Sequence, residues 1–242
     1  MLHTLHDAPR QTPRARRRDA NHARILGAAM ELVAEGGLEA LSMGRLAEAA
    51  AYTPGALYRY FPGKDALLAA LVGQVLDELQ VFLLSAESAL PQPARPLPRV
   101  FALAHAYRRF ARERPHPFGL LSATIAAPRV LLETKAAAPV AERAVALLEQ
   151  LASALGDATK AGQLAAPPGD DAAHGGEFTR TICLFAQLQG LLQLQKQARF
   201  STGLLELAPL VSHAVRALLV GWGGAPKTVD AALASLPEGA LT

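Results

Sequence analysis

Residues 41–65 read LSMGRLAEAAAYTPGALYRYFPGKD, and the spacing of polar and apolar residues in this stretch predicts two short helices in close succession. Ser42 suits the N-cap of the first helix, because its hydroxyl can accept a hydrogen bond from an unpaired backbone N–H. Leu41 can pack against Leu46 across that cap as a hydrophobic staple. The first helix is therefore expected to begin after Ser42 and to run for about two turns.

The same arrangement recurs a few residues later. Thr53 suits the N-cap, and Pro54 follows at the first helical position, where its missing N–H costs nothing. Tyr52 and Leu57 have the spacing of a second staple. Two short helices joined by so tight a turn must cross steeply, which is the geometry of a helix-turn-helix.

The flanking sequence supplies the rest of a three-helix core. Residues 19–35 are expected to form an amphipathic helix that ends at a glycine stop, Gly36-Gly37. Residues 65–90 are expected to form a long helix leading out of this small domain. The apolar positions of the first helix are Ile25, Leu26, Ala29, Leu32 and Val33.

The remainder of the chain predicts further helices and no large sheet, since Ala and Leu dominate its apolar content. The expected class is all-α with about nine helices, the later ones at 97–114, 117–126, 137–161, 177–200 and 204–222. A proline-rich linker occupies 91–98, and 165–176 reads as an exposed loop. The predicted domains are a disordered basic arm (1–18), a helix-turn-helix domain (19–65), a larger helical domain (66–224) and a fraying tail (225–242).

Composition excludes several classes of protein. The chain has 242 residues, of which 51% are hydrophobic and 19% charged, values typical of a globular rather than a disordered protein. It has one cysteine and neither an apolar leader nor an uninterrupted apolar run long enough to span a membrane, so a cytoplasmic location is expected. Six arginines stand against two aspartates in residues 1–24, an excess of basic charge suited to DNA but equally to a solvated tail.

A set of short motifs runs through residues 18–68: Arg24-Ile25-Leu26, Ala28-Ala29, Gly36-Gly37, Leu41-Ser42-Met43, Leu46-Ala47, Ala49-Ala50, the run from Thr53 to Phe61, and Lys64-Asp65. Through these motifs the segment resembles the DNA-binding domain of the tetracycline-repressor (TetR/AcrR) family. The resemblance implies an all-helical homodimer that binds double-stranded operator DNA. It also implies a C-terminal domain that binds a small-molecule effector and dimerises through its last two helices.

The resemblance assigns roles to residues of the helix-turn-helix. Tyr58 and Lys64 would hold phosphates, while Ser42 and Thr53 would cap helices and touch the DNA backbone. The base-edge or groove candidates are Arg45, Gly55, Arg59 and Tyr60. Pro54 and Ala56 also lie at the N-terminal end of the second helix and are small enough not to block its entry into the major groove. One departure is Ala51, which occupies a turn position where the family usually has glycine.

Effector and dimer contacts are less well defined by the sequence. The pocket candidates adjoin the main apolar stripes and are Phe101, His105, Arg108, Phe118, Leu121, Ile125, Cys183 and Gln187. The dimer candidates are the apolar stripes of the last two helices, at Leu184, Leu188, Leu191, Leu192, Leu210, Val211, Val215 and Leu218. Cys183 itself reads as a small core residue, and no acidic side chain is evident that would balance a cationic effector.

The expected function is a ligand-responsive transcriptional regulator, a repressor released from a pseudo-palindromic operator when an effector shifts the 65–90 helix. A helical small-molecule-binding or interaction protein that has lost operator recognition is the alternative. An enzyme is not expected, because the sequence has no nucleophile elbow, phosphate-binding loop or dinucleotide turn. Neither a cofactor nor a metal site is expected, since the histidines are scattered and only His3 and His6 have ligand-like spacing.

Overall fold

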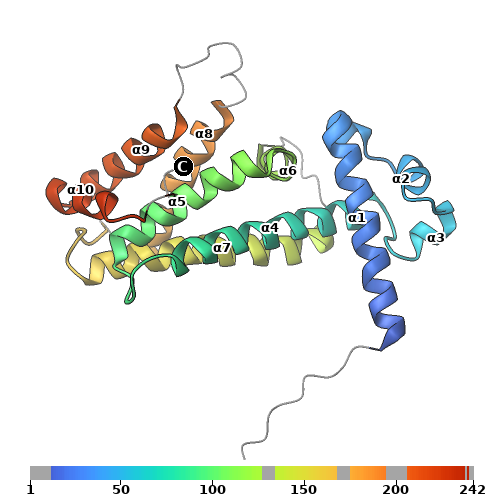
Figure 1. Ribbon diagram of the computed structural model, residues 1–242, viewed down its shortest axis with the longest axis horizontal. Coiled ribbons are helices and arrows are strands. Elements are labelled where there is room, and N and C mark those ends of the chain that lie inside the picture. Colours follow the sequence, from blue (N-terminus) through green and yellow to red (C-terminus); the bar gives the residue numbers. More distant parts are fainter. Residues whose placement is uncertain (1–11, 127–133, 168–174, 195–205, 238, 240–242) are drawn as a thin grey trace, which may run out of the picture. The chain divides into compact units, whose positions relative to one another are not determined.

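The computed structural model describes residues 12–126, 134–167, 175–194, 206–237 and 239, and within these ranges it has ten helices and no strand (Figure 1). The chain divides into two compact units between Leu71 and Val72. The all-α class predicted from the sequence is confirmed.

The first unit starts with α1 (Pro13–Ala40), which begins earlier than the sequence suggested. The Thr12 hydroxyl accepts a hydrogen bond from the Ala15 amide at 3.3 Å, and Pro13 takes the first helical position. Residues 13–18 of the predicted disordered arm are therefore helical, while residues 1–11 lie outside the described ranges. Arginine is a good helix former, so a polar arginine run after a Thr-Pro cap continues a helix without any apolar periodicity.

The predicted glycine stop in α1 is a kink in the structure. Gly36 departs from helical geometry, and Gly37 has a φ of 68°, in the left-handed region that suits glycine. A short turn continues to Ala40 beyond the kink. The helix thus changes direction at the position where the sequence predicted its end.

The two short helices follow the capping pattern closely. In α2 (Met43–Ala49) the Ser42 hydroxyl accepts from the Arg45 amide at 3.2 Å. In α3 (Pro54–Tyr58) the Thr53 hydroxyl accepts from the Ala56 amide at 3.3 Å. The core beneath them is fully buried and consists of Ile25, Ala29, Leu41, Leu46, Leu57, Phe61 and Leu67.

The turn between α2 and α3 carries backbone strain. The Tyr52 amide donates to the Ala47 carbonyl at 2.8 Å, and the Ala51 amide donates to the Glu48 carbonyl at 3.1 Å. These two bonds form the Schellman motif, in which the residue after the C-cap is left-handed and usually glycine. Ala51 occupies that position with a φ of 56°. The turn therefore forms with alanine in place of glycine, at the cost of backbone strain.

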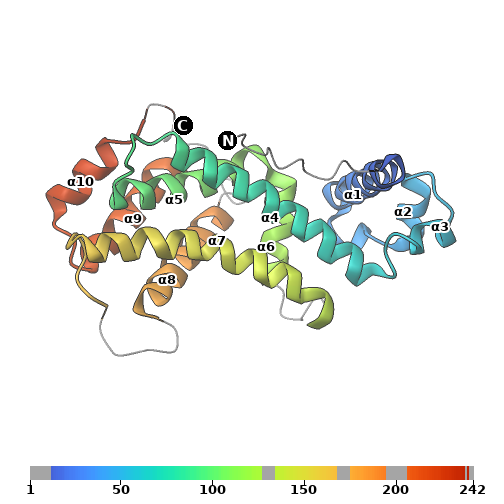
Figure 2. The ribbon, with the colours of Figure 1, turned by 90° about the horizontal axis from the view of Figure 1, so that it is seen from below.

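The second unit is built around α5 (Pro96–Glu113), which is buried along most of its length. It contacts α6 (Pro115–Ala126), α7 (Thr134–Lys160), α8 (Gly175–Leu194), α9 (Leu207–Gly221) and α10 (Pro226–Ala234), and the views in Figures 1 and 2 agree with this central place. The helix α4 (Lys64–Ser88) begins in the first unit and continues into the second. Every helix predicted between residues 97 and 222 has a counterpart in α5 to α9.

The last helix corrects the prediction of a fraying tail. Residues 226–234 form α10, which packs against α5 and α9 with Val229 fully buried and Ala232 nearly so. Pro226 takes the first helical position, and Val229 and Ala232 lie three residues apart on one face. This short pattern predicts a helix, but it is easily overlooked beside the neighbouring glycines and prolines.

Within the described residues, α4 is the one helix whose length and composition would let it cross a membrane. Half of its most apolar window is buried inside the structure, as in the core helix of a globular protein. Asp77 and Glu78 interrupt its apolar run.

Candidate nucleic-acid interface and internal cavity

The start of α3 is open and built of small residues. Thr53, Pro54 and Gly55 are exposed, and Ala56 is half-buried. A Cβ added at Gly55 would meet no atom within 4 Å. Among residues 12–71, nothing therefore obstructs the approach of a DNA groove to this end of α3.

Polar and basic side chains surround this opening. Ser42, Arg45, Arg59 and Lys64 are exposed, and half of the Tyr58 surface is accessible to solvent. No acidic side chain in the described part of the chain forms an ion pair with Arg45, Arg59 or Lys64. Their charges thus remain available for phosphate oxygens, which arginine and lysine bind through charge-assisted hydrogen bonds.

Tyr60 differs from the other groove candidates because it is engaged in packing. Its hydroxyl accepts a hydrogen bond from Asn21 Nδ2 at 3.1 Å, and its ring meets the Tyr52 ring edge-on at 5.8 Å. The Arg24 guanidinium in turn lies 4.9 Å from the centre of the Tyr52 ring. The Asn21 and Arg24 contacts tie α1 to the region of α3, and sequence reasoning missed them because they join residues 39 and 28 positions apart.

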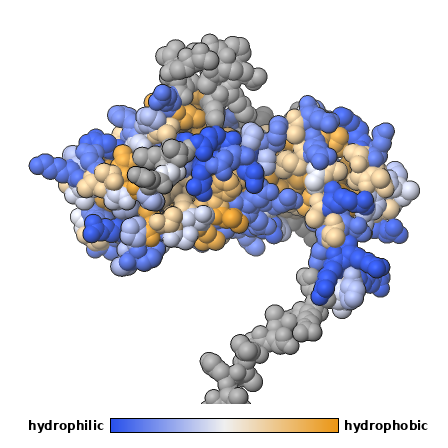
Figure 3. Space-filling view, in the orientation of Figure 1, coloured by the Kyte–Doolittle hydropathy of each residue, from blue (hydrophilic) through white to orange (hydrophobic). Residues whose placement is uncertain are grey.

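The arginines expected on a flexible arm lie on the first turns of α1 instead. Arg14, Arg16, Arg17 and Arg18 are all exposed, and the start of α1 is strongly hydrophilic in Figure 3. A helix fixes the directions of these side chains relative to one another. The predicted contact of this cluster with DNA remains a prediction.

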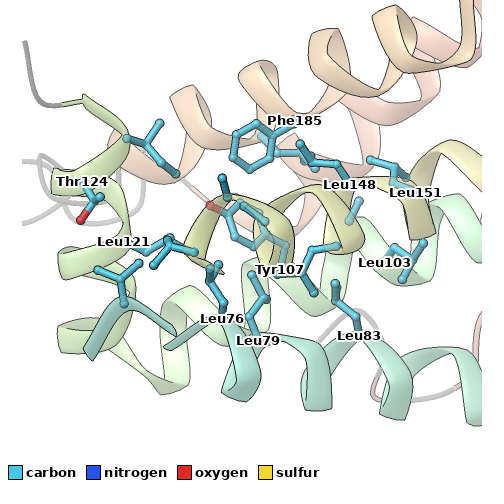
Figure 4. Close-up of a pocket in the computed structure, with 18 of the residues that line it drawn as sticks. Leu76, Leu79, Leu83, Leu103, Tyr107, Leu121, Thr124, Leu148, Leu151 and Phe185 are labelled. Atoms are coloured by element: carbon cyan, nitrogen blue, oxygen red, sulfur yellow. The ribbon is translucent and has the colours of Figure 1, made fainter. Parts of the chain in front are cut away.

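The second unit contains an apolar cavity of about 330 Å³, shown in Figure 4. Helices α4 to α8 all contribute to its wall, and α7 contributes the largest share. Three lining residues of α7 are alanines, at 137, 141 and 144. The other lining residues are Val72, Leu76, Leu79, Leu83, Leu103, Ala104, Tyr107, Leu121, Thr124, Ile125, Val140, Leu147, Leu148, Leu151, Phe185 and Leu188.

Two of the eight predicted pocket residues, Leu121 and Ile125, line this cavity. Phe101, His105 and Arg108 are buried elsewhere along α5, and Phe118 packs edge-on against Tyr107 with ring centres 5.7 Å apart. The face of α5 that lines the cavity carries Leu103 and Tyr107 instead. A sequence pattern shows that such a helix is apolar, but on a helix buried all round it does not show which face meets a cavity.

Cys183 and Gln187 are exposed on α8, so the expectation that Cys183 is a core residue is wrong for the single chain. Phe185, which lies between them in sequence, lines the cavity and packs with its ring centre 5.9 Å from that of Tyr107. Successive helical residues point about 100° apart, which places these neighbours on different faces.

A hydrogen-bonded group of side chains adjoins the cavity. The Tyr107 hydroxyl donates to Gln189 Oε1 at 2.5 Å, and Gln189 Nε2 donates to Ser122 Oγ at 3.0 Å. Burial raises the pKa of Tyr107 well above its usual value, so the phenol stays protonated. Two residues before Tyr107 on α5, burial and the positive charge of Arg108 lower the pKa of His105 to about 4. His105 is therefore neutral at pH 7, with Nε2 3.0 Å from Ser212 Oγ.

The apolar stripes predicted for dimerisation are mostly used inside the chain. Leu184, Leu188, Leu192, Val211 and Val215 are buried in the core of the second unit, whereas Leu191, Leu210 and Leu218 are partly exposed. The periodicity identified the apolar face of each helix, but that face packs against α5 and α7. The exposed face of α8 carries Ile182, Cys183, Ala186, Gln187, Gly190 and Leu194.

Comparison with known proteins places both units in one family. Residues 25–71 match the family described as "Bacterial regulatory proteins, tetR family", and residues 100–218 match "Tetracyclin repressor-like, C-terminal domain". Over 56 residues, 23% of this chain, the sequence is 41% identical to the HTH-type transcriptional repressor KstR of Mycolicibacterium smegmatis. That alignment spans 28% of KstR, little more than a quarter of its length.

Solved structures share the fold at low sequence identity. A protein of unknown function from Rhodococcus sp. RHA1 has a TM-score of 0.66 and 22% identity, with 89% of this chain and 99% of that one covered. RolR in complex with resorcinol has a TM-score of 0.59 and 19% identity, with 93% and 98% covered. The family matches extend over both the helix-turn-helix unit and the helical unit that holds the cavity. The chain belongs to the tetR family of bacterial transcriptional regulators.

Proposed function

We propose that the protein is a repressor that binds a pseudo-palindromic operator as a homodimer and releases it when a small molecule occupies the cavity in the second unit. The observation that carries this proposal is the pairing of an exposed, basic helix-turn-helix in one unit with a preformed apolar cavity in the other. The helix α4 contributes to both units, and four of its residues line the cavity.

The proposed release works through α4. An effector that contacts Val72, Leu76, Leu79 and Leu83 favours one position of this helix, and α4 also carries Lys64, next to α3. In a dimer, a change in the spacing of the two recognition helices weakens operator binding, because both half-sites must be matched at once. Thermodynamic linkage then requires that the DNA weaken effector binding by the same factor.

DNA binding is tested by fluorescence anisotropy, with the DNA upstream of the gene and a shuffled duplex compared over a series of salt concentrations. Selective binding with a steep dependence on salt is expected. Arg59→Ala and Tyr58→Ala should weaken it strongly, whereas Arg112→Ala, which removes an exposed arginine from α5, should leave it unchanged. Equal and weak binding to both duplexes would refute operator recognition and favour a protein that only binds small molecules.

The proposed dimer uses the exposed face of α8. Ile182 and Leu194 are each 40% exposed there, and with the exposed Ala186 and Gly190 they form a stripe at four-residue spacing that a second copy of the chain can cover. Light scattering at micromolar concentration should give twice the 25.5 kDa mass of the chain. Ile182→Asp should reduce the mass to that of the monomer, and Val145→Asp, at a similarly exposed apolar position on α7, should not. A monomer in the unmodified protein would refute this part of the proposal.

A further inference from the structure

The cavity wall has little polarity and carries no charge. Among the described residues that line it, Tyr107 and Thr124 alone have a polar side-chain group, and none is acidic or basic. Figure 4 shows the ring of Tyr107 lying among the leucines and Phe185. A carboxylate or an ammonium group placed in this cavity would lose its hydration without gaining a counter-charge. The wall therefore favours an uncharged molecule.

The two hydroxyl groups of the cavity wall already donate their hydrogens to acceptors within the protein. Tyr107 donates to Gln189 Oε1, and Thr124 donates to the Leu120 carbonyl at 2.9 Å. A hydroxyl has one hydrogen to donate, but its oxygen also accepts. Toward a molecule in the cavity, both groups can therefore act only as acceptors unless they break their present bonds.

Breaking the Tyr107 bond would disturb more than one residue. A ketone, ester or carboxylate could accept from Tyr107 only if the phenol hydrogen turned away from Gln189, which would leave Oε1 of Gln189 without this donor. The ring itself is held by Phe118 and Phe185, and Tyr107 is only 5% exposed. A ligand that donates to the Tyr107 oxygen leaves the chain of bonds through Gln189 and Ser122 intact.

We infer that the effector is an uncharged, mostly apolar molecule that carries a hydroxyl or another neutral hydrogen-bond donor and anchors it on the oxygen of Tyr107. This inference rests on the proposed function, which places the effector in this cavity, and it adds the chemical class of the molecule. It distinguishes alcohols and phenols from ketones, esters and carboxylic acids of the same size.

The test uses three probes that share a ten-carbon chain: 1-decanol, which donates, 2-decanone, which only accepts, and decanoate, which is charged. Calorimetric titration of the full-length protein should show 1-decanol binding about tenfold more tightly than 2-decanone, the ratio expected for one hydrogen bond of ordinary strength. Decanoate should bind more weakly than either neutral probe.

Tyr107→Phe isolates the anchoring bond, because it removes the hydroxyl and keeps the ring. The preference for 1-decanol over 2-decanone should fall to about the ratio that their hydrophobicities alone give, while 2-decanone binds as before. Thr124→Val provides a second variant whose small isosteric change preserves the fold, and it should retain the preference. Far-ultraviolet circular dichroism verifies that both variants are folded.

A matched pair of variants locates binding in the cavity. Ala144→Phe fills the cavity and should abolish binding of 1-decanol, while Ala146→Phe makes the same change on the same helix at an exposed position that does not line it. Equal affinities for 1-decanol and 2-decanone in the unmodified protein, or a preference that Tyr107→Phe leaves undiminished, would overturn the inference. Binding that Ala144→Phe leaves intact would also overturn it.

The proposed function is tested separately by adding 1-decanol to the DNA complex. Release of DNA together with the predicted preference supports both statements. Cavity binding with the predicted preference but no release supports the inference about the cavity and contradicts the proposed regulation. DNA binding without any binding of 1-decanol to the protein overturns the inference and leaves operator recognition standing.

Discussion

Replacing Ala51 by glycine should stabilise the helix-turn-helix unit. Ala51 has a φ of 56°, in the left-handed region, where a side chain with a Cβ costs about 1–2 kcal/mol relative to glycine. Glycine also makes the unfolded chain more flexible, which offsets about 0.4–1 kcal/mol of that gain. The expected net increase in the free energy of unfolding is about 0.5–1 kcal/mol.

The control is the same substitution in a helix. Ala23 is exposed near the middle of α1, where an alanine-to-glycine change should cost about 1 kcal/mol. The two variants alter composition identically, so opposite signs would identify backbone conformation as the cause.

Urea denaturation can follow the two units separately. Trp222 is the only tryptophan of the chain and lies at the end of α9, so its fluorescence reports on the second unit, whereas circular dichroism reports on all helices. Ala51→Gly should move the dichroism transition to higher urea concentration. An unchanged or lowered stability, as expected for Ala23→Gly, would refute the reasoning from the Schellman turn.

Three further outcomes follow from buried groups of the second unit. Because the pKa of His105 falls from 6.5 to about 4 on folding, protonation of His105 favours the unfolded state. The free energy of unfolding should therefore fall as the pH drops from 6.5 toward 4. His105→Gln should remove up to about 3 kcal/mol of that loss, as measured by denaturation curves at both pH values. The largely buried Arg99 guanidinium forms ion pairs with Glu87 and Asp157, each at an N–O distance of 2.9 Å. Thermal melts should show the Arg99→Met variant destabilised by about 1–3 kcal/mol. An unchanged melt would mean that the two carboxylates are adequately solvated without the arginine. Val229→Ala should cost about 1–2 kcal/mol in urea denaturation if α10 belongs to the core, and nothing if it frays.

Local chemistry made the first unit predictable. The caps at Ser42 and Thr53 depend on residues a few positions apart, and the structure has both of them. The glycine pair that predicted the end of a helix marks a kink in α1 instead, and Ala51 takes the left-handed conformation of the turn. The start of α1 is not predictable from apolar periodicity, because only a Thr-Pro cap followed by arginines marks it. The packing of Tyr60 could not be predicted, because its hydrogen bond to Asn21 joins residues distant in sequence.

The cavity was much harder to predict. On α5 nearly every residue is buried, so a hydrophobic pattern cannot tell Leu103, which lines the cavity, from Phe101, which does not. Empty space is also a property of several helices together. The alanines of α7 help to create it, and in the sequence they read only as good helix formers.

The small side chains of these alanines allow the cavity to change shape during evolution. Ala137, Ala141 and Ala144 extend little into the space they border, so enlarging any of them changes the shape of the cavity without removing a core side chain. Single substitutions on one helix can therefore shorten, narrow or divide the cavity while the rest of the second unit is preserved. Under the proposed function, a lineage of such regulators can acquire a new effector in small steps, each of which leaves a folded protein for selection to act on.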